Sequence, residues 1–317
     1  MKPVRPFLSV VVCTKNRAKL LDLCLASLIS QKSSRHPFEI IVVDNHSTDG
    51  TKNIVRSLIK KYPAIKYLEY RGHSVSAARN KGWNAARGTF VAFIDDDAVA
   101  HKNWIKSIFN FAARHHSIGI FGGPYASDTD GRAHSWLPKQ YVELFNGTKE
   151  KELPIGREWL SGTNLIVRKD VLAKLRGFDE KLMFADGSFV FGEETKLLSV
   201  ARTYGERVYY VPRIRVVHHT DLRKYSLRWQ LQKYFRMGRS SVYVHNQKDT
   251  IWYHMASFAD KVVRCMYWTV YPKSIPWKRR IFLALHGLFS WAGAFAVWIG
   301  IVPGCVGRSY EKNFGSQ

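Results

Sequence analysis

The chain has 317 residues, of which 46% are hydrophobic and 14% aromatic, and this composition argues against a disordered protein. Its 49 Lys and Arg against 25 Asp and Glu give a formal net charge of +24, so we expect an anionic partner: nucleic acid, a phosphorylated small molecule or an acidic membrane. Four scattered cysteines without a CxxC pair argue against a disulfide framework and a structural zinc site. The apolar run after Met1 is too short for a signal peptide, so we expect the catalytic part in the cytoplasm.

The first 220 residues alternate between strand and helix patterns. Apolar runs at 7–13, 39–44, 67–70 and 89–94 predict buried strands, and amphipathic stretches between them predict helices. Continuously apolar strands separated by helices are typical of an α/β fold with a mostly parallel sheet covered on both faces. The sequence has no GxGxxG fingerprint, Walker A loop, GxSxG or HExxH motif, which disfavours the enzyme classes that depend on them.

Polar side chains follow the ends of these strands. Thr14 follows the first strand, Asp44 the second, and Asp95, Asp96 and Asp97 the fourth. In parallel sheets such ends share one edge, where ligands bind. Neighbouring carboxylates raise each other's pKa unless a cation or a hydrogen-bond donor relieves them, and hard oxygen ligands suit Mg²⁺ or Mn²⁺. The alternative is an acidic turn that caps the next helix, without a metal.

Several motifs in this region carry a family resemblance. Residues 9–17, 40–50 and 74–97 closely resemble family 2 glycosyltransferases of the GT-A fold, the kind that builds cell-surface glycans. The resemblance resumes at 160–168, 177–180, 192–195 and 211–219, and covers roughly residues 7 to 220. It implies a GT-A, Rossmann-like domain that transfers a sugar, with inversion, from a nucleotide-diphosphate donor to a hydroxyl. A UDP-sugar is the donor that the resemblance favours.

The resemblance also implies roles for individual residues. The nucleotide would contact Thr14, Arg17, Asp44, Arg79, Asp95 and Asp96. The metal, Mn²⁺ or Mg²⁺, would be held by Asp97, Asp95 and His218. Two alternatives stay open, because Arg79 could be an exposed helix residue and a lone histidine at a strand end is more often structural.

A second acidic pair, Glu193 and Glu194, matches the family position of the catalytic base. An inverting transfer needs a carboxylate that deprotonates the acceptor hydroxyl. The family usually has Asp at the second position, so both residues remain candidates and we favour Glu194. A charged pair at a helix start would explain the same residues without catalysis. Gly162, Thr163 and Asn164 are expected to form a wall of the donor and acceptor cleft.

The C-terminal region, residues 221–317, differs in composition from the rest. It has 15 Lys and Arg against 4 Asp and Glu, and six of the ten tryptophans. Residues 281–302 carry no charge and follow Lys278, Arg279 and Arg280, so the segment could span a membrane or lie along its surface. We therefore expect two domains, 1–220 and 221–317, the second a basic helical region on an anionic membrane. The protein would act at the cytoplasmic face of the membrane on a lipid-linked or cell-surface glycan.

Two other function classes compete with this interpretation. A GT-A fold could serve as a non-catalytic membrane scaffold, although the retained acidic residues argue against it. A nucleic-acid-binding protein would explain the net charge, but the sequence contains no RRM, KH, helix-turn-helix or zinc-finger pattern. We therefore expect no nucleic-acid partner.

Overall fold

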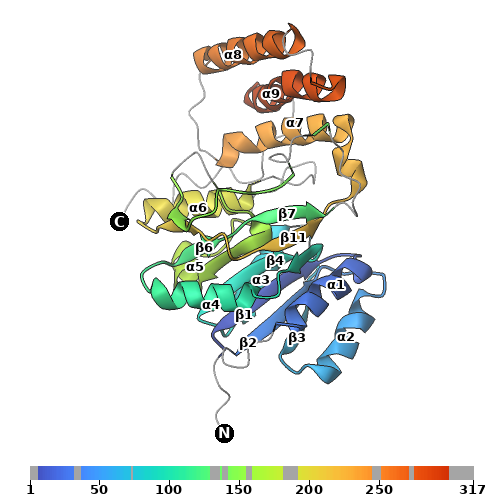
Figure 1. The fold of residues 1–317 in the computed structure, drawn as a ribbon, viewed down its shortest axis with the longest axis vertical. Helices are drawn as coiled ribbons and strands as arrows, with labels where there is room; N and C mark the ends of the chain where they lie inside the picture. Colours follow the sequence, from blue (N-terminus) through green and yellow to red (C-terminus); the bar gives the residue numbers. More distant parts are fainter. Residues whose placement is uncertain are drawn as a thin grey trace. The chain divides into compact units, whose positions relative to one another are not determined.

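The structure is a computed structural model that describes residues 6–31, 37–72, 74–128, 136–137, 142–154, 159–180, 192–244, 251–270 and 275–299 (Figure 1). The chain divides into two compact units. The sheet unit comprises Met1–Asp128, Val142–Asp179 and Leu197–Thr220, and the helical unit comprises Thr129–Tyr141, Glu180–Lys196 and Asp221–Gln317.

An eight-stranded sheet in the order β3-β2-β1-β4-β9-β6-β10-β8 forms the centre of the sheet unit. The strands are β1 (Leu8–Thr14), β2 (Phe38–Asp44), β3 (Ile65–Glu69), β4 (Phe90–Asp95), β6 (Ile120–Gly122), β8 (Lys151–Glu152), β9 (Leu165–Arg168) and β10 (Val208–Tyr210). Pairing is parallel from β3 through β4 and between β6 and β10. β9 runs antiparallel to both β4 and β6, and β8 antiparallel to β10. The predicted mostly parallel sheet is confirmed.

Both faces of this sheet are buried, which explains its continuously apolar strands. Consecutive residues of β1, such as Val10 and Val11, point to opposite faces and belong to two separate hydrophobic clusters. The first cluster includes residues of α1 (Ala18–Ile29), α2 (Thr51–Lys61) and α4 (Trp104–Arg114). The second includes residues of α3 (Val75–Ala85), α5 (Lys169–Leu175) and α6 (Glu193–Thr203). Helices therefore cover both faces, as predicted.

A second sheet, of three strands, begins with the strand that follows the acidic triplet. It contains β5 (Ala98–Ala100), β7 (Tyr125–Asp128) and β11 (Val216–His219), in the order β5-β11-β7. β11 pairs antiparallel with β5, so that His218 lies opposite Ala98, and the His219 N–H donates to the Asp97 carbonyl at 2.7 Å. The end of the sheet unit is thereby joined by backbone hydrogen bonds to the segment that carries the aspartates.

The described part of the helical unit after residue 220 is a short 3₁₀ turn, Leu222–Tyr225, followed by α7 (Leu227–Val244), α8 (Ile251–Val270) and α9 (Trp277–Trp298). α9 packs against both α7 and α8, and lies between them in Figure 1. Among the described residues, α9 alone is long and apolar enough to cross a membrane, by length and composition. It contains the beginning of the apolar segment 281–302, whose last three residues lie outside the described part.

Candidate functional site

Three parallel strands bring the predicted nucleotide-site residues to one edge of the sheet. β1 ends at Thr14, β2 ends at Asp44, and the two residues are register partners. β4, the other neighbour of β1, ends at Asp95, which pairs with Cys13. The predicted convergence of polar strand ends is thus found in the structure.

The acidic triplet is held by hydrogen bonds from β1 and the start of α1. The Thr14 hydroxyl donates to Asp96 Oδ2 at 2.7 Å. Arg17 Nη1 donates both to Asp96 Oδ1 at 2.9 Å and to Asp97 Oδ2 at 2.7 Å. The side chains of Asp96 and Asp97 are each 6% exposed, whereas that of Arg17 is 43% exposed. Burial raises the pKa of Asp96 to about 6, against the opposing effects of Arg17 and Thr14.

The residues predicted to hold a metal also come together. His218 Nε2 lies 3.0 Å from Asp97 Oδ1. Asp95, Asp97 and His218 each offer a ligand atom, and these atoms all lie within 4.8 Å of one another. Two carboxylates and an imidazole form a donor set that fits a divalent cation. The Arg17 guanidinium forms an ion pair with one of these carboxylates, that of Asp97.

The alternative of a helix cap does not explain the triplet. Asp97 is followed by β5, and α4 begins only at Trp104 after Asn103, which makes no side-chain capping hydrogen bond. The three carboxylates instead contact Arg17, Arg79, Thr14 and His218.

Arg79 is a buried residue of α3, so its interpretation as an exposed helix residue is wrong. Its Nη2 lies 3.2 Å from Asp95 Oδ1, and its guanidinium lies 5.5 Å from the ring centre of Phe178. A Cβ added to Gly162 would lie 2.7 Å from Arg79 Nη2. The absence of a side chain at Gly162 therefore makes room for Arg79.

Asp44 is oriented by two neighbours that the sequence analysis did not select. Its Oδ1 accepts from the Ser47 backbone N–H at 3.0 Å and hydroxyl at 2.5 Å, and its Oδ2 accepts from the Tyr67 hydroxyl at 2.6 Å. Burial and the Asp44 carboxylate raise the pKa of Tyr67, which keeps the phenol protonated as a donor. Tyr67 lies on β3 opposite Val42, so the register of β2 and β3 would have been needed to find it.

Asn164 links three segments of the sheet unit. It is fully buried, its amide oxygen accepts from Trp104 Nε1 at 2.9 Å, and its amide nitrogen donates to the carbonyls of Pro124 and Ile214. The side chain thus joins the 3₁₀ turn Gly162–Asn164 to the segments before β7 and β11, and the role of this turn as a wall of the donor and acceptor cleft stays a prediction. Thr163 is buried as well.

Glu193 and Glu194 form the first turn of α6. From Leu197 onward this helix belongs to the sheet unit and contributes Leu197, Leu198 and Ala201 to its second cluster. The two glutamates belong to the helical unit. Their role as catalytic base stays a prediction.

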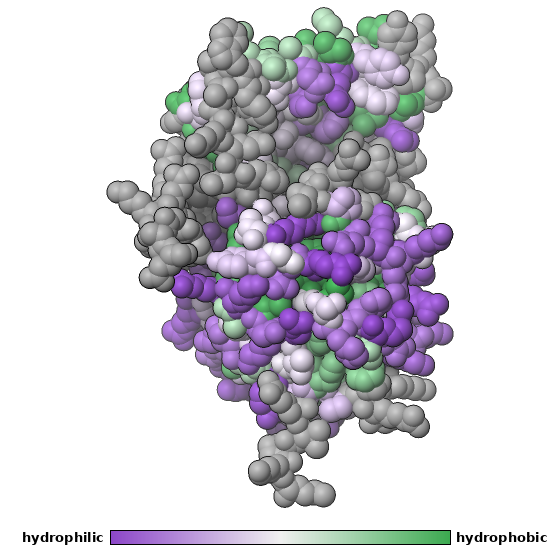
Figure 2. Space-filling view, turned by 90° about the vertical axis from the view of Figure 1, so that its left-hand side faces the viewer, coloured by the Kyte–Doolittle hydropathy of each residue, from purple (hydrophilic) through white to green (hydrophobic). Residues whose placement is uncertain are grey.

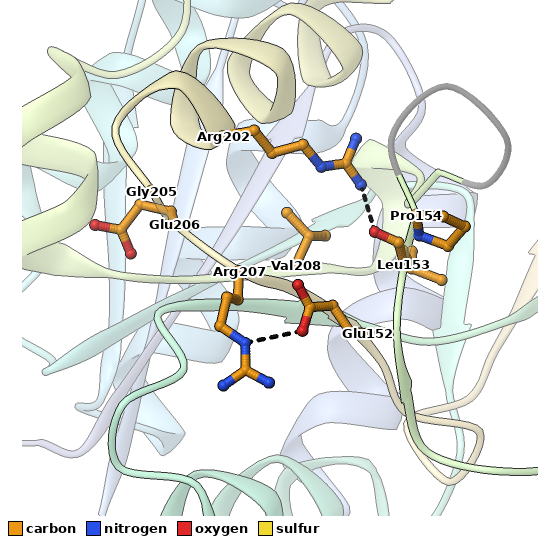
Figure 3. Close-up of a pocket in the computed structure, with 8 residues that line it drawn as sticks. All are labelled: Glu152, Leu153, Pro154, Arg202, Gly205, Glu206, Arg207 and Val208. Carbon is orange, nitrogen blue, oxygen red and sulfur yellow. Dashed lines mark hydrogen bonds and ion pairs between the residues drawn. The ribbon is translucent and has the colours of Figure 1, made fainter.

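A pocket at the outer edge of the sheet contains none of the predicted site residues (Figure 3). It is lined by Glu152, Leu153, Pro154, Arg202, Gly205, Glu206, Arg207 and Val208. Arg207 Nε pairs with Glu152 Oε2 at 2.8 Å, and Arg202 Nη2 donates to the Leu153 carbonyl at 3.0 Å. Because β9, β6 and β10 separate β8 from β4, this pocket is distinct from the acidic edge.

Parts of this chain are similar in sequence to known proteins. Glycosyltransferase AglE of Haloferax volcanii is 28% identical over 189 residues, which cover 58% of this chain and 59% of the relative. Poly(ribitol-phosphate) β-N-acetylglucosaminyltransferase TarP of Staphylococcus aureus is 28% identical over 144 residues, covering 44% and 42%. The Pasteurella multocida chondroitin synthase is 30% identical over 151 residues, 46% of this chain but 14% of that protein. The chain therefore matches less than two thirds of the length of these relatives.

Solved structures share the fold over most of the chain. The mannosyltransferase PcManGT of Pyrobaculum calidifontis, in complex with GDP-Man and Mn²⁺, aligns with a TM-score of 0.62 and 17% identity, covering 94% of this chain and 88% of that one. S. aureus TarS 1–349 in complex with UDP-GlcNAc aligns with a TM-score of 0.56 and 18% identity, covering 92% of each. The GT-A-type fold is thereby confirmed.

The family itself follows from the sequence match. The model of glycosyl transferase family 2 matches residues 9–176, more than half of the chain. This segment contains the strand ends at Thr14, Asp44 and Asp95 together with the rest of the acidic triplet. The chain belongs to glycosyl transferase family 2.

Proposed function

We propose that the protein transfers a sugar from a nucleotide-diphosphate donor to an acceptor hydroxyl, with inversion at the sugar C1. The observation that carries this proposal is the convergence of Thr14, Asp44 and the acidic triplet at one sheet edge, beside a metal-ligand group. Nucleotide sugars accompany two structural neighbours, GDP-Man in one and UDP-GlcNAc in the other. We propose a UDP-sugar as donor, because Asp44 offers a carboxylate acceptor for a base N–H.

Each residue of the acidic edge would contact a different part of the donor. Asp44 accepts from the base and Asp96 from the ribose, while Arg79 and Arg17 supply positive charge beside the nucleotide. Asp95, Asp97 and His218 would hold Mn²⁺ or Mg²⁺, which when bound neutralises negative charge on the diphosphate. Because the carboxylates are already neutralised in part by Arg17, the edge can accept an anionic ligand.

A carboxylate completes the reaction. We propose that Glu194, or otherwise Glu193, takes the proton of the acceptor hydroxyl as its oxygen forms a bond to C1. The bond from C1 to the diphosphate breaks, and its electron pair leaves with the diphosphate. The match of residues 192–195 to the family motif supports this role.

The composition of the helical unit supports our proposal for the acceptor and the location. Its segment 221–317 has a net charge of +11 and contains α9, a 22-residue helix that is uncharged from Ile281 to its end and long and apolar enough to cross a membrane. We propose that the protein works at the cytoplasmic face of a membrane on a lipid-linked or cell-surface glycan. No nucleic acid is needed to account for its charge.

Donor turnover tests the proposed reaction. Purified protein is incubated with a panel of nucleotide sugars in the presence of Mn²⁺, Mg²⁺ or EDTA, and released nucleotide is measured. We expect metal-dependent release from one donor, and a loss of about 100-fold or more in Asp97→Asn, because the substitution removes a ligand charge. Asp22→Asn, an exposed residue of α1, is the matched control and should retain activity. Donor binding without turnover under any metal would favour the scaffold alternative.

A further inference from the structure

α7 and α9 are in direct backbone contact within the helical unit. A Cβ added to Gly238 of α7 would lie 1.7 Å from the carbonyl oxygen of Ser290 in α9. A Cβ added to Gly293 of α9 would lie 1.9 Å from the carbonyl oxygen of Phe235 in α7. The two glycines therefore let the helices touch, and no lipid chain can separate them.

This contact bears on whether α9 crosses a bilayer. α7 carries four basic residues within 18 positions, Arg228, Lys233, Arg236 and Arg239. If α9 crossed the hydrocarbon core, this basic helix would have to lie within the core or at its boundary, at a high cost for each charge. α9 is also covered by α8 on another side, where the Phe258 and Trp291 ring centres are 4.6 Å apart. The packing favours α9 as the middle helix of a protein layer.

α8 has an outward apolar face. Met255, Ala259, Val263, Met266 and Val270 recur at spacings of four, four, three and four residues, which places them on one side of the helix. We call these five residues the α8 outer face. All five are exposed, and the four large side chains are each more than half exposed. Figure 2 shows green hydrophobic side chains among purple hydrophilic ones at the top of the view. Exposed apolar surface of this kind marks a site of interaction.

Charged and aromatic residues border this face. Arg280, in the first turns of α9, donates to the carbonyls of Thr269 and Trp268 at the end of α8. Trp277 and Lys278, both exposed, therefore begin α9 next to the end of the α8 outer face, and Lys278 Nζ lies 5.6 Å from the Trp277 ring centre. Tryptophan with lysine is typical of the boundary between lipid and water.

The net positive charge of residues 221–317 favours a lipid membrane over a second copy of the chain as the partner of this surface. A second copy of the chain would bring together two segments that each carry +11, whereas anionic lipid headgroups neutralise that charge. We propose that the α8 outer face is the membrane-binding surface of the protein, which inserts into the interface of one anionic leaflet while α9 remains within the protein layer. This proposal rests on the membrane association proposed above and is independent of the transfer reaction.

Vesicle sedimentation tests the surface. The full-length protein is mixed with vesicles of phosphatidylcholine alone, or of phosphatidylcholine with phosphatidylglycerol, and the bound fraction is measured at low and high salt. We expect binding to the anionic vesicles that weakens with salt, and a loss of at least about tenfold in the double variant Val263→Asp with Met266→Asp. Leu23→Asp, at an apolar position of α1 that is half exposed, is the control and should bind like the wild type. Circular dichroism verifies that the variants fold.

Four outcomes would overturn the proposal. Absence of wild-type binding would reject membrane association itself, whereas equal binding by the wild type and the double variant would reject the surface alone. A double variant that stays in cell membranes after alkaline carbonate extraction would show that α9 spans the bilayer. Light scattering that shows a wild-type dimer and a monomeric double variant with unchanged vesicle binding would assign the face to a second copy. Donor turnover by the double variant in solution should be unchanged, which separates this test from that of the transferase.

Discussion

Arg17 contacts a carboxylate that belongs to the candidate metal-ligand group. Its Nη1 lies 2.7 Å from Asp97 Oδ2, and Asp97 is one of the three residues that can hold a cation. The same nitrogen also contacts Asp96 at 2.9 Å. The guanidinium therefore stabilises the buried carboxylates in the ligand-free protein, and a bound cation would have to share or displace it.

Arg17→Gln should tighten the binding of Mn²⁺ in the absence of nucleotide by about five- to tenfold, because a competing positive charge is removed from a partly exposed site. The same change should weaken nucleotide binding. Free Mn²⁺ measured by electron paramagnetic resonance gives the affinity without any turnover. Lys19→Gln removes an equal charge from an exposed position of α1 and serves as the control. Equal shifts in both variants would indicate a general charge effect and contradict the competition.

The sequence identified most residues of the acidic edge because strand ends are visible in it. Thr14, Asp44 and the three aspartates each follow an apolar run, and parallel pairing then brings them together. Tyr67 could not be found in this way, because its contact with Asp44 depends on the register of β2 and β3. The role of Asn164 was also not visible, since its three partners come from separate parts of the chain.

At the scale of elements, long strands and helices were predictable and short ones were not. β1, β2 and β4 have six or seven residues and show clear apolar runs. β5, β7 and β11 have three or four residues each, too few for a periodic pattern. The antiparallel insertion of β9 between β4 and β6 is likewise a property of the chain path rather than of its own four residues.

The helix pair α7 and α9 gives a prediction at this scale. Gly238→Ala should destabilise the helical unit by about 2 kcal/mol, because its Cβ would meet backbone that cannot move without separating the helices. Thermal unfolding and hydrogen exchange of α9 would measure this loss. Gly287→Ala is a matched control on α9, because its Cβ would meet only the flexible Lys261 side chain at 3.0 Å. A Gly238→Ala protein as stable as the Gly287→Ala protein would contradict the close packing of α7 on α9.

At the scale of the whole molecule, the boundaries of the two units agree only in part with the changes in amino-acid composition along the chain. The last segment of the helical unit begins at Asp221, where basic residues and tryptophans become frequent. The segments Thr129–Tyr141 and Glu180–Lys196 also belong to that unit. They have no distinctive composition, so only the three-dimensional contacts assign them.

The stability of the sheet unit should depend on pH through Glu39, which is 2% exposed. Burial alone would raise its pKa, but hydrogen bonds from Lys66, Ser9 and the Arg87 backbone lower it below the ordinary 4.5. A carboxyl group with a lowered pKa stabilises the fold at neutral pH, and this contribution is lost as the pH falls below about 4.5. Glu39→Gln should therefore be less stable by about 2 kcal/mol at neutral pH, with a smaller difference from wild type in acid.

Urea unfolding at neutral and acidic pH measures this difference. Glu69→Gln is the control, because Glu69 is a largely exposed residue paired with Lys52, and surface pairs contribute little. If the difference between wild type and Glu39→Gln is the same at both pH values, the hydrogen-bonded carboxylate is not the source of acid sensitivity.

The position of β11 determines how far the protein can be truncated from its C-terminal end. The strand ends at His219, it carries His218, and its backbone bonds to Asp97, so it is the last part of the chain that the acidic edge requires. The helical unit resumes two residues later, at Asp221. A fragment designed for expression without the helices must therefore run through Thr220, and a cut even five residues earlier would remove both the histidine and the strand that supports the aspartates.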